Sequence, residues 1–470
     1  MTTPYDRVAY PTAVFSQTHP ERLAVLAMLA GLDPVDPARA RILEIGGGDC
    51  MNLMSIAASW PDCQAHGFDL SEAAIARGSD IAARAGLGNV SLAVEDICAA
   101  QSRYPARSFD YVIAHGVYAW VPDHVRRATM ELIGHALSDR GVAFVSYNCM
   151  PGGHIRHIMR EMLLNVIGDI EDPDEKIAAT RDFLEDYAKP RDGDPLLTRT
   201  LREQAEAMLE RPDAVLFHDE LGDCFNPQSL AVVVAAGEGV GLKFLTDAGR
   251  NRHLDGFIEG EEPGSADPDA QVLRAAIRAD YVAMRYFRQT AFVRGEQQPD
   301  RRIDANRIAT LYLTTKLQRQ EDGSFMMGKD SLEIPDEELA LALERAAAAG
   351  LQRVRVADIA TTPLQLRVIL QLYAEWYVNL HPAPTPFPDR PGEYPQTSPL
   401  IRAMLEGGER MICTLDHGLL KIDQPELRAL LMAADGTRSM AEVADAGHGI
   451  PPEEVRDALT AAAARALMRA

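Results

Sequence analysis

Short apolar segments alternate with helical segments along the first 150 residues, and this alternation constrains the fold more than any other feature. The intervening segments carry the apolar period of about 3.6 residues that is typical of helices. Because parallel strands need long crossover connections, this pattern predicts a parallel sheet with helices on both faces, an α/β domain of the Rossmann-like kind. The predicted strands are RILEI (41–45), AHGFD (65–69), VSLAV (90–94), FDYVIA (109–114) and GVAFVSY (141–147).

Two later apolar segments, 242–248 and 288–294, are strand-like and complete the sheet if they join it. The catalytic domain then extends to about residue 295, and a charge-rich segment without strand alternation becomes a helical insertion. A Pro-rich segment (381–396) precedes a final unit with the hairpin, helix, turn, helix order of a winged helix. The predicted units are a core (1–154), a helical insertion acting as lid or dimerisation element (155–215), the completion of the sheet (216–295), a middle regulatory or substrate domain (296–390) and a C-terminal α+β, winged-helix-like domain (391–470).

The chain carries 69 acidic and 47 basic residues, a formal net charge of -22. Such a surface repels phosphate backbones and argues against a nucleic-acid partner, whereas a lysine-rich protein partner is compatible with it. A charge of this kind also serves simply to keep a protein in solution. No apolar stretch approaches the roughly 20 residues that span a bilayer, and the first residues lack a secretory signal, so we expect a cytoplasmic protein without membrane insertion. The six cysteines form no C-x-x-C pair, and no metal site is expected.

The motif LEIGGGDCMN (43–52) joins a predicted strand to a predicted helix. Glycines at this position let a ligand approach the backbone at the carboxyl edge of the sheet. Gly46, Gly48 and Asn52 are therefore candidate ligand contacts. A tight turn between strand and helix also uses glycine, so the motif alone leaves both interpretations open.

Three acidic residues stand near the ends of successive predicted strands. Asp69 lies about 20 residues beyond the glycines, where a carboxylate accepts the two hydroxyls of a ribose. Asp96 follows the next strand, where it meets an adenine amino group, and Glu44 precedes the turn, where it reaches the amino group of a bound amino acid. Each acid alone is also explained as a helix cap or a solvated charge. Together, with their neighbours Leu70 and Ile97, they predict a nucleoside-bearing ligand.

The pattern E-x-G-G-G-D, with Asp69 and Asp96, resembles the signature of class I S-adenosylmethionine-dependent methyltransferases. A dinucleotide-binding loop would usually have its third glycine where Met51 stands. The resemblance implies S-adenosylmethionine as the cofactor and assigns its binding to residues 1–154. It narrows to bacterial methyltransferases that carry a methyltransferase regulatory domain over the segments 10–24, 109–122, 146–163, 216–221 and 285–294.

That family includes rickettsial protein-lysine methyltransferases that modify outer-membrane proteins. The resemblance therefore implies N-methylation of lysine in an outer-membrane or other lysine-bearing protein, and a homodimer formed through the insertion. The alternatives are a methyltransferase for a small metabolite and a cofactor-binding regulatory protein without catalysis. This chain departs from the family at Cys50, where a glycine is usual, and at Met150 and Gly153, where aromatic residues are usual.

Candidate catalytic residues follow the fourth and fifth predicted strands, where an acceptor amine would meet the cofactor. They are His115, Tyr118, Trp120, Tyr147 and Asn148, and His115 is also a candidate cofactor contact. Core packing is the alternative for the aromatic residues, and a structural hydrogen bond for His115.

The resemblance also implies that an N-terminal segment folds over the cofactor through Tyr10, Gln17, Thr18 and His19. The spacing from Thr18 to Glu21 additionally predicts a capping box at the start of a helix. Arg156 and Arg160 lie on a predicted helix with the charge pattern of a solvated face.

Overall fold

The computed structural model describes residues 8, 10–249, 256–257, 267–446 and 448–469. Its central element is a seven-stranded sheet with the order β3-β2-β1-β4-β5-β7-β6, in which only β7 runs antiparallel to its neighbours. The predicted fold class is confirmed, and both later strand-like segments join the sheet. The strands are β1 (Arg41–Ile45), β2 (Gln64–Asp69), β3 (Val90–Val94), β4 (Phe109–Ala114), β5 (Leu137–Asn148), β6 (Leu242–Asp247) and β7 (Phe287–Arg294).

Alternate side chains of the central strands enter two different cores, one on each face of the sheet. Ile42 and Phe144 pack with α2 and α3, whereas the adjacent Leu43 and Val145 pack with α6, α11 and α12. Because successive residues of a strand point to opposite faces, an almost continuously apolar strand is buried on both sides. The flanking helices are α2 (Pro20–Leu29), α3 (Met51–Ser59), α4 (Glu72–Arg84), α5 (Ile97–Ala100), α6 (Asp123–Ala136), α11 (Leu230–Glu238) and α12 (Pro268–Val282).

The strand order changes direction between β1 and β4, since β1 continues to β2 and β3 on one side and β4 to β5 on the other. Connections to the two sides leave a crevice beyond the carboxyl ends of these strands, where ligands bind in open α/β sheets. The loop that follows β1 at this edge is the glycine motif 46–50.

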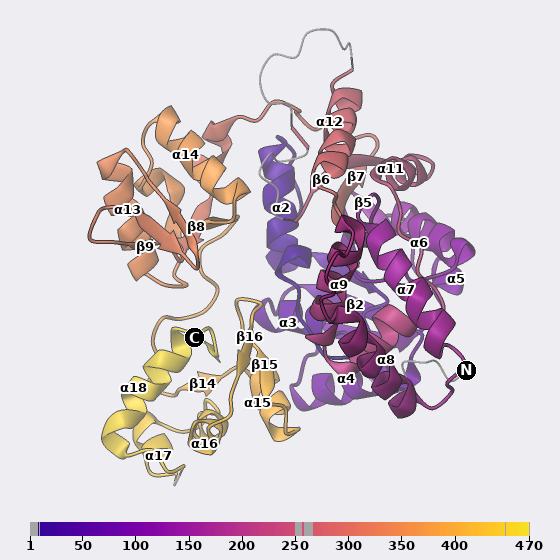
Figure 1. The fold of residues 1–470 in the computed structure, drawn as a ribbon. Helices are drawn as coiled ribbons and strands as arrows, with labels where there is room; N and C mark the ends of the chain where they lie inside the picture. The colour runs from indigo at the N-terminus through magenta and orange to yellow at the C-terminus, as the bar shows by residue number, and fades with distance from the viewer. Residues whose placement is uncertain (1–7, 9, 250–255, 258–266, 447, 470) are drawn as a thin grey trace.

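Between β5 and α11 the chain forms a helical insertion with its own small core. Met159, Leu163, Leu184, Leu201 and Met208 supply the buried side chains of this core. Figure 1 shows α7, α8 and α9 gathered on the side of the sheet domain away from the C-terminal units. The insertion comprises α7 (Gly153–Ile167), α8 (Pro173–Ala188), α9 (Leu196–Leu209), α10 (Asp213–Val215) and the single π-helical turn η3 (Leu216–Glu220).

The chain beyond β7 forms two further units, drawn in orange and yellow in Figure 1. The first holds a three-stranded sheet with the order β12-β8-β13, a small sheet β11-β10-β9, and two helices. Its elements are β8 (Tyr312–Thr315), β9 (Gln318–Arg319), β10 (Phe325–Met327), β11 (Asp330–Leu332), α13 (Glu337–Ala348), β12 (Val354–Arg355), α14 (Pro363–Ala374) and β13 (Val378–His381).

The second unit contains the hairpin β15–β16 followed by helices, in the order that the sequence predicts. Its elements are β14 (Gln396–Thr397), α15 (Pro399–Glu406), β15 (Met411–Cys413), β16 (Leu419–Lys421), α16 (Pro425–Ala433), α17 (Met440–Ala444), α18 (Pro452–Ala463) and β17 (Met468–Arg469).

Both C-terminal units share buried cores with the sheet domain. Leu23 and Leu26 of α2 belong to the same apolar cluster as Leu313 and Ile369 of the orange unit. Met51, Met54 and Ala58 of α3 belong to the same cluster as Leu400, Met404 and Ile412 of the yellow unit. Helix α2, which precedes β1, and helix α3, which follows the glycine loop, are therefore covered by residues from far along the chain. None of the helices in the described part of the chain is long and apolar enough to cross a membrane.

Candidate functional site

The glycine loop turns sharply between β1 and α3. Gly46, Gly48 and Cys50 have φ angles of 65°, 61° and 56°, in the left-handed region that favours glycine. A Cβ on Gly46 would lie 2.6 Å from Val117 Cγ2, whereas a Cβ on Gly48 would have nothing within 4 Å. The Gly46 turn therefore needs a glycine for packing, and Gly48 faces space that a ligand can use. Cys50 keeps the left-handed turn without being glycine, with a fully buried side chain packed against Gly67.

Asp69 is the last residue of β2, which lies beside β1 in the sheet, and its side chain holds the glycine loop in place. Its Oδ2 accepts a hydrogen bond from Gly48 N at 2.9 Å, and its Oδ1 accepts one from Ser71 N at 2.9 Å. Asp96 caps the short helix α5, with Oδ1 accepting from Cys98 N at 2.9 Å. The side chain of Leu70, the residue after Asp69, is 53% exposed, and Ile97, the residue after Asp96, is half-buried. The structure thus brings the predicted ribose and adenine contacts to one edge of the sheet.

Glu44 is a buried carboxylate with one uncommitted oxygen. Its Oε1 accepts from Asn52 Nδ2 at 2.6 Å, whereas its Oε2 is buried and accepts no hydrogen bond from the described residues. Burial and, to a smaller extent, the carboxylates of Asp49 and Asp69 raise the pKa of Glu44 to about 7, against the opposing effect of the Asn52 bond. A buried carboxylate surrounded by other acids is costly to ionise unless a cationic group meets it. Its Oε2 therefore fits a ligand ammonium.

The N-terminal segment lies across the same edge. Phe15 N donates to Asn52 Oδ1 at 2.9 Å, and Thr12 Oγ1 donates to Asp49 Oδ2. The Phe15 ring packs on the His115 ring with centroids 3.9 Å apart. Residues 12–18 therefore connect the end of β4 with the glycine loop and α3.

The predicted capping box at Thr18 is wrong. His19 is the N-cap of α2 and makes no side-chain cap bond. Thr18 Oγ1 instead donates to Phe15 O at 2.9 Å and accepts from Asn52 Nδ2 at 3.0 Å. The buried amide gives this hydroxyl a better partner than the helix start does. Tyr10 lies farther out, with its hydroxyl 3.4 Å from Asp219 Oδ1, and Gln17 is half-buried.

The five candidate catalytic residues fall into three settings. His115 accepts or donates a hydrogen bond to Ser146 Oγ at 2.9 Å, and burial lowers its pKa to about 4, so the ring is neutral at physiological pH. Tyr118 and Tyr147 are buried in the core with ring centroids 6.0 Å apart, and the Tyr147 hydroxyl bonds Thr290 Oγ1 at 2.9 Å. Asn148 is also buried. This placement favours the packing interpretation for the two tyrosines.

Trp120 belongs to an aromatic and cationic cluster that the sequence did not indicate. The guanidinium carbons of Arg156 and Arg160 lie 5.1 Å and 5.6 Å from the centre of its ring, and Phe225 packs against it at 5.0 Å. Arg156 pairs with the fully buried Glu220 at 2.6 Å. The prediction of a solvated face for Arg156 and Arg160 is therefore wrong, because the turn η3 folds back over α7 and supplies the acid.

A second group missed by the sequence comes from the C-terminal hairpin. His417 reaches Asn52 Oδ1 at 3.0 Å, across 365 positions of the chain. No periodicity or motif pointed to this contact.

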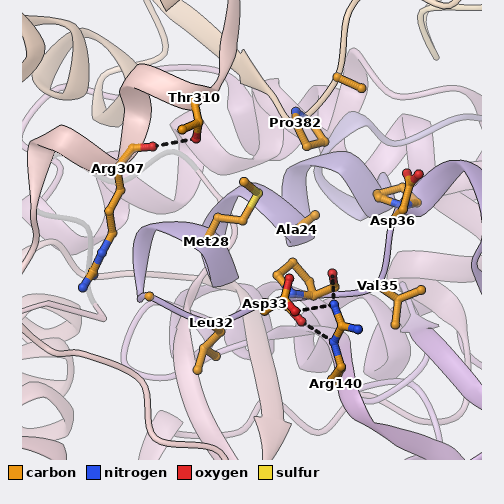
Figure 2. A pocket seen from close by; sticks show the side chains of 14 residues that line it. Ala24, Met28, Leu32, Asp33, Val35, Asp36, Arg140, Arg307, Thr310 and Pro382 are labelled. Atoms are coloured by element: carbon orange, nitrogen blue, oxygen red, sulfur yellow. Dashed lines mark hydrogen bonds and ion pairs between the residues drawn. The ribbon is translucent and has the colours of Figure 1, made fainter.

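The cavity drawn in Figure 2 lies at the other edge of the sheet. It has a volume of about 590 Å³ and is lined by residues 33–37, which precede β1, by Arg140 near the start of β5, and by Arg307 and Pro382. The Arg140 guanidinium is held by the carbonyls of Asp33 and Pro34 and by the Asp33 carboxylate. The cavity lies at the amino ends of the parallel strands, away from the glycine loop. This position argues against the cavity as the ligand site, because ligands of such sheets bind beyond the carboxyl ends.

Three comparisons with known proteins agree with this geometry. A family model described as a methyltransferase domain matches residues 42–141, which span β1 to the first part of β5. Protein RP028 of Rickettsia prowazekii is 32% identical over 226 residues, which cover 47% of this chain and 87% of that protein. Protein RP789 of the same organism is 26% identical over 315 residues, which cover 65% of this chain and 55% of that protein.

Among solved structures, PKMT2 from Rickettsia typhi superposes with a TM-score of 0.80 at 20% identity, over 98% of this chain and 100% of that one. The same protein in complex with AdoHcy gives a TM-score of 0.77. The likeness includes the insertion and both C-terminal units, since it covers almost the whole chain.

Proposed function

Because the chain belongs to the class I S-adenosylmethionine-dependent methyltransferases, we propose that it transfers the methyl group to lysine side chains of a protein. Its cofactor is S-adenosylmethionine. The observation that carries the lysine acceptor is the fold shared with PKMT2 along 98% of the chain, together with the sequence resemblance to protein-lysine methyltransferases. An outer-membrane protein or another lysine-bearing protein is the proposed partner.

The residues at the carboxyl edge fit this cofactor. Glu44 would meet the ammonium of the methionine moiety with its uncommitted Oε2, Asp69 the ribose hydroxyls and Asp96 the adenine amino group. Gly46 and Gly48 would let the ligand approach the backbone, and Leu70 and Ile97 would cover the adenine faces. Tyr10, Gln17, Thr18, His19 and His115 would close the site from the N-terminal segment and β4, with Asn52 holding Glu44.

When bound, the cofactor supplies a methyl group on a sulfonium sulfur for in-line displacement by an acceptor nitrogen. A lysine acceptor must first lose a proton, since its ordinary pKa is about 10.4. Phe15, Phe144 and Phe287 surround His115 with ring centroids 3.9, 5.9 and 6.3 Å from it. Such an apolar wall lowers the pKa of an adjacent ammonium by desolvation, and the neutral His115 adds no repelling charge.

The remaining candidate residues have supporting roles in this proposal. Trp120 is covered by Arg156 and Arg160, so its face is already occupied by the chain's own cations. Tyr118, Tyr147 and Asn148 form the floor below the acceptor and position the ends of β4 and β5. This assignment gives His115 and its aromatic neighbours the direct contact with the acceptor.

The test incubates the purified protein and radiolabelled S-adenosylmethionine with a lysate divided into macromolecules and small metabolites. Label recovered as methyl-lysine after hydrolysis of the protein fraction is the expected result. Label found only in metabolites would replace the proposal by a small-molecule methyltransferase. Asp69→Ala should abolish labelling, and Asp139→Asn is the matched control, because Asp139 is exposed near the start of β5, at the opposite edge.

We further propose a homodimer and a cytoplasmic location. The dimer is supported by apolar side chains exposed on the insertion, namely Leu164, Val166, Leu196 and Leu197. Light scattering of the wild type and of Val166→Asp tests this interface, and cell fractionation tests the location. A wild-type mass of one chain in solution would contradict the dimer.

A further inference from the structure

The turn of the β15–β16 hairpin inserts a buried histidine into the sheet domain. Residues 414–418 connect the two strands, with Gly418 N bonded to Thr414 Oγ1 at 2.9 Å and His417 N to Thr414 O at 3.0 Å. His417 is 4% exposed and has a φ of 60°, so the turn directs an otherwise polar ring into the interior. Ser59 of α3 holds the neighbouring Leu415 carbonyl at 2.8 Å. The hairpin is thus fixed to α3 through Leu415, two residues before the ring.

Both nitrogens of His417 contact α3, one turn apart. Nε2 lies 3.0 Å from Asn52 Oδ1, and Nδ1 lies 3.0 Å from Ser55 Oγ. An amide oxygen only accepts hydrogen bonds, so Nε2 carries the proton and Nδ1 accepts from the Ser55 hydroxyl. Burial and the nearby His19 hold the pKa of His417 well below its ordinary value, which keeps this neutral form.

The Asn52 amide is the meeting point of three parts of the chain. Its Nδ2 donates to Glu44 Oε1 at 2.6 Å and to Thr18 Oγ1 at 3.0 Å. Its Oδ1 accepts from Phe15 N at 2.9 Å in addition to the His417 ring. A histidine donor fixed at Oδ1 prevents the amide from rotating its oxygen toward Glu44, where two acceptors would face each other.

We infer that His417 is a positioning residue for cofactor binding, acting through Asn52 on both the Glu44 carboxylate and the N-terminal segment. The C-terminal unit is then a part of the cofactor site and not only an addition for acceptor recognition. Loss of the contact removes one of the two donors at Oδ1, which weakens the hold on the Asn52 amide and with it the placement of Glu44 and Phe15. The inference rests on the proposed role of Glu44 in binding the cofactor ammonium, and it needs no acceptor for its test.

Substitutions of His417 by Gln and by Asn test separately the two contacts of the ring, with Asn52 and with Ser55. Gln places its amide nitrogen where Nε2 lies and can keep the bond to Asn52, whereas Asn reaches only as far as Nδ1 and Ser55. Asn adopts left-handed backbone conformations more readily than Gln, so strain at φ 60° cannot explain a weaker Asn variant. Ile412→Ala, in the same hairpin but at an apolar side chain that cannot hydrogen-bond Asn52, controls for general loosening of the unit.

Calorimetric titration with S-adenosylmethionine should give a near-normal dissociation constant for His417→Gln and one about tenfold higher for His417→Asn. Ser55→Ala and Ile412→Ala should bind within about twofold of the wild type. Amide hydrogen exchange of the cofactor-free protein should be faster at Phe15 in His417→Asn and unchanged in His417→Gln.

Equal affinities of the Gln and Asn variants would overturn the inference, as would an equal loss of affinity in Ile412→Ala. A titration of Glu44→Gln separates this failure from failure of the proposed function. If Glu44→Gln weakens binding and His417→Asn does not, only the role of His417 is refuted. If Glu44→Gln binds normally, the proposed ammonium contact is refuted, and the role of His417 falls with it.

Discussion

Replacing Glu44 by Gln should make the cofactor-free protein more stable and the cofactor complex weaker. Burial raises the pKa of Glu44 to about 7 from an ordinary value of 4.5. At about 1.36 kcal/mol per pH unit, this difference corresponds to roughly 3 kcal/mol of destabilisation above pH 7. An amide of the same shape keeps the bond with Asn52 and carries no charge, so most of this destabilisation should disappear.

The sign of the pH dependence follows from the direction of the pKa shift. A raised carboxyl pKa means that the folded protein binds the proton more tightly than the unfolded chain does. The wild type therefore loses stability as the pH rises from about 4.5 to about 7. Above this range the difference in stability between the wild type and Glu44→Gln is constant. The gain from Glu44→Gln should be roughly 3 kcal/mol at pH 8 and below about 1 kcal/mol at pH 5.

Cofactor affinity should change in the opposite sense. If only the ionised carboxylate holds the ammonium, the dissociation constant of the wild type rises about tenfold for each pH unit below 7. Glu44→Gln should bind weakly and show no such slope between pH 5 and pH 7. The comparison stays below pH 7 because an α-amino group itself loses its proton near pH 8.

Thermal unfolding of the cofactor-free protein and calorimetric titration with S-adenosylmethionine, both at pH 5, 6, 7 and 8, measure the two effects. Glu72→Gln is the matched control, since Glu72 is exposed in the first turn of α4. A lower melting temperature for Glu44→Gln at pH 8 would refute the buried-charge argument. A wild-type affinity independent of pH between 5 and 7 would refute the ammonium contact.

Four further outcomes follow from the same geometry. Asp69→Asn keeps one acceptor for the loop but loses the charge, and calorimetry should show at least tenfold weaker cofactor binding with little loss of stability. Glu220→Gln removes the nearer of the two carboxylates that pair with Arg156 and leaves Asp219 at 3.1 Å, so urea unfolding should show a loss of about 2 kcal/mol; an unchanged midpoint would contradict the buried pair. His115 has a pKa of about 4, so its ring resonances in nuclear magnetic resonance should not shift between pH 5.5 and 8. Phe15→Ala removes one ring of the apolar wall but keeps the backbone bond to Asn52, so it should lower kcat more than it raises the KM for the cofactor.

The sheet and the glycine loop were predictable because their signals are local. Each strand of the first half is a short apolar run, and the loop at 46–48 is marked by three consecutive glycines between a strand and a helix. The acids at 44, 69 and 96 follow from strand ends once the parallel order is known. Such features depend on residues within a few positions of one another or on the topology of the whole sheet.

The remaining parts of the site depend on contacts that no local pattern encodes. Arg156 and Arg160 have the spacing of a solvated helix face, and only the return of η3 over α7 brings Glu220 to them. Thr18 has the spacing of a helix cap, but a buried amide competes successfully for its hydroxyl. His417 stands 365 positions from its partner, in a turn without any motif.

The contacts between the sheet domain and the C-terminal units cover two helices of the sheet domain, α2 and α3. Glu21 of α2 is buried and pairs through both oxygens with Arg353, at 2.7 Å each, and this arginine helps to hold the pKa of Glu21 well below its ordinary value. Without Arg353 the carboxylate would be buried without its strongest counter-charge, and the apolar faces of α2 and α3 would be uncovered. Helix α3 carries Asn52 and directly follows the loop that would bind the cofactor, and α2 precedes β1 in the chain. The C-terminal units therefore maintain the chemistry of an edge of the sheet to which they contribute no strand.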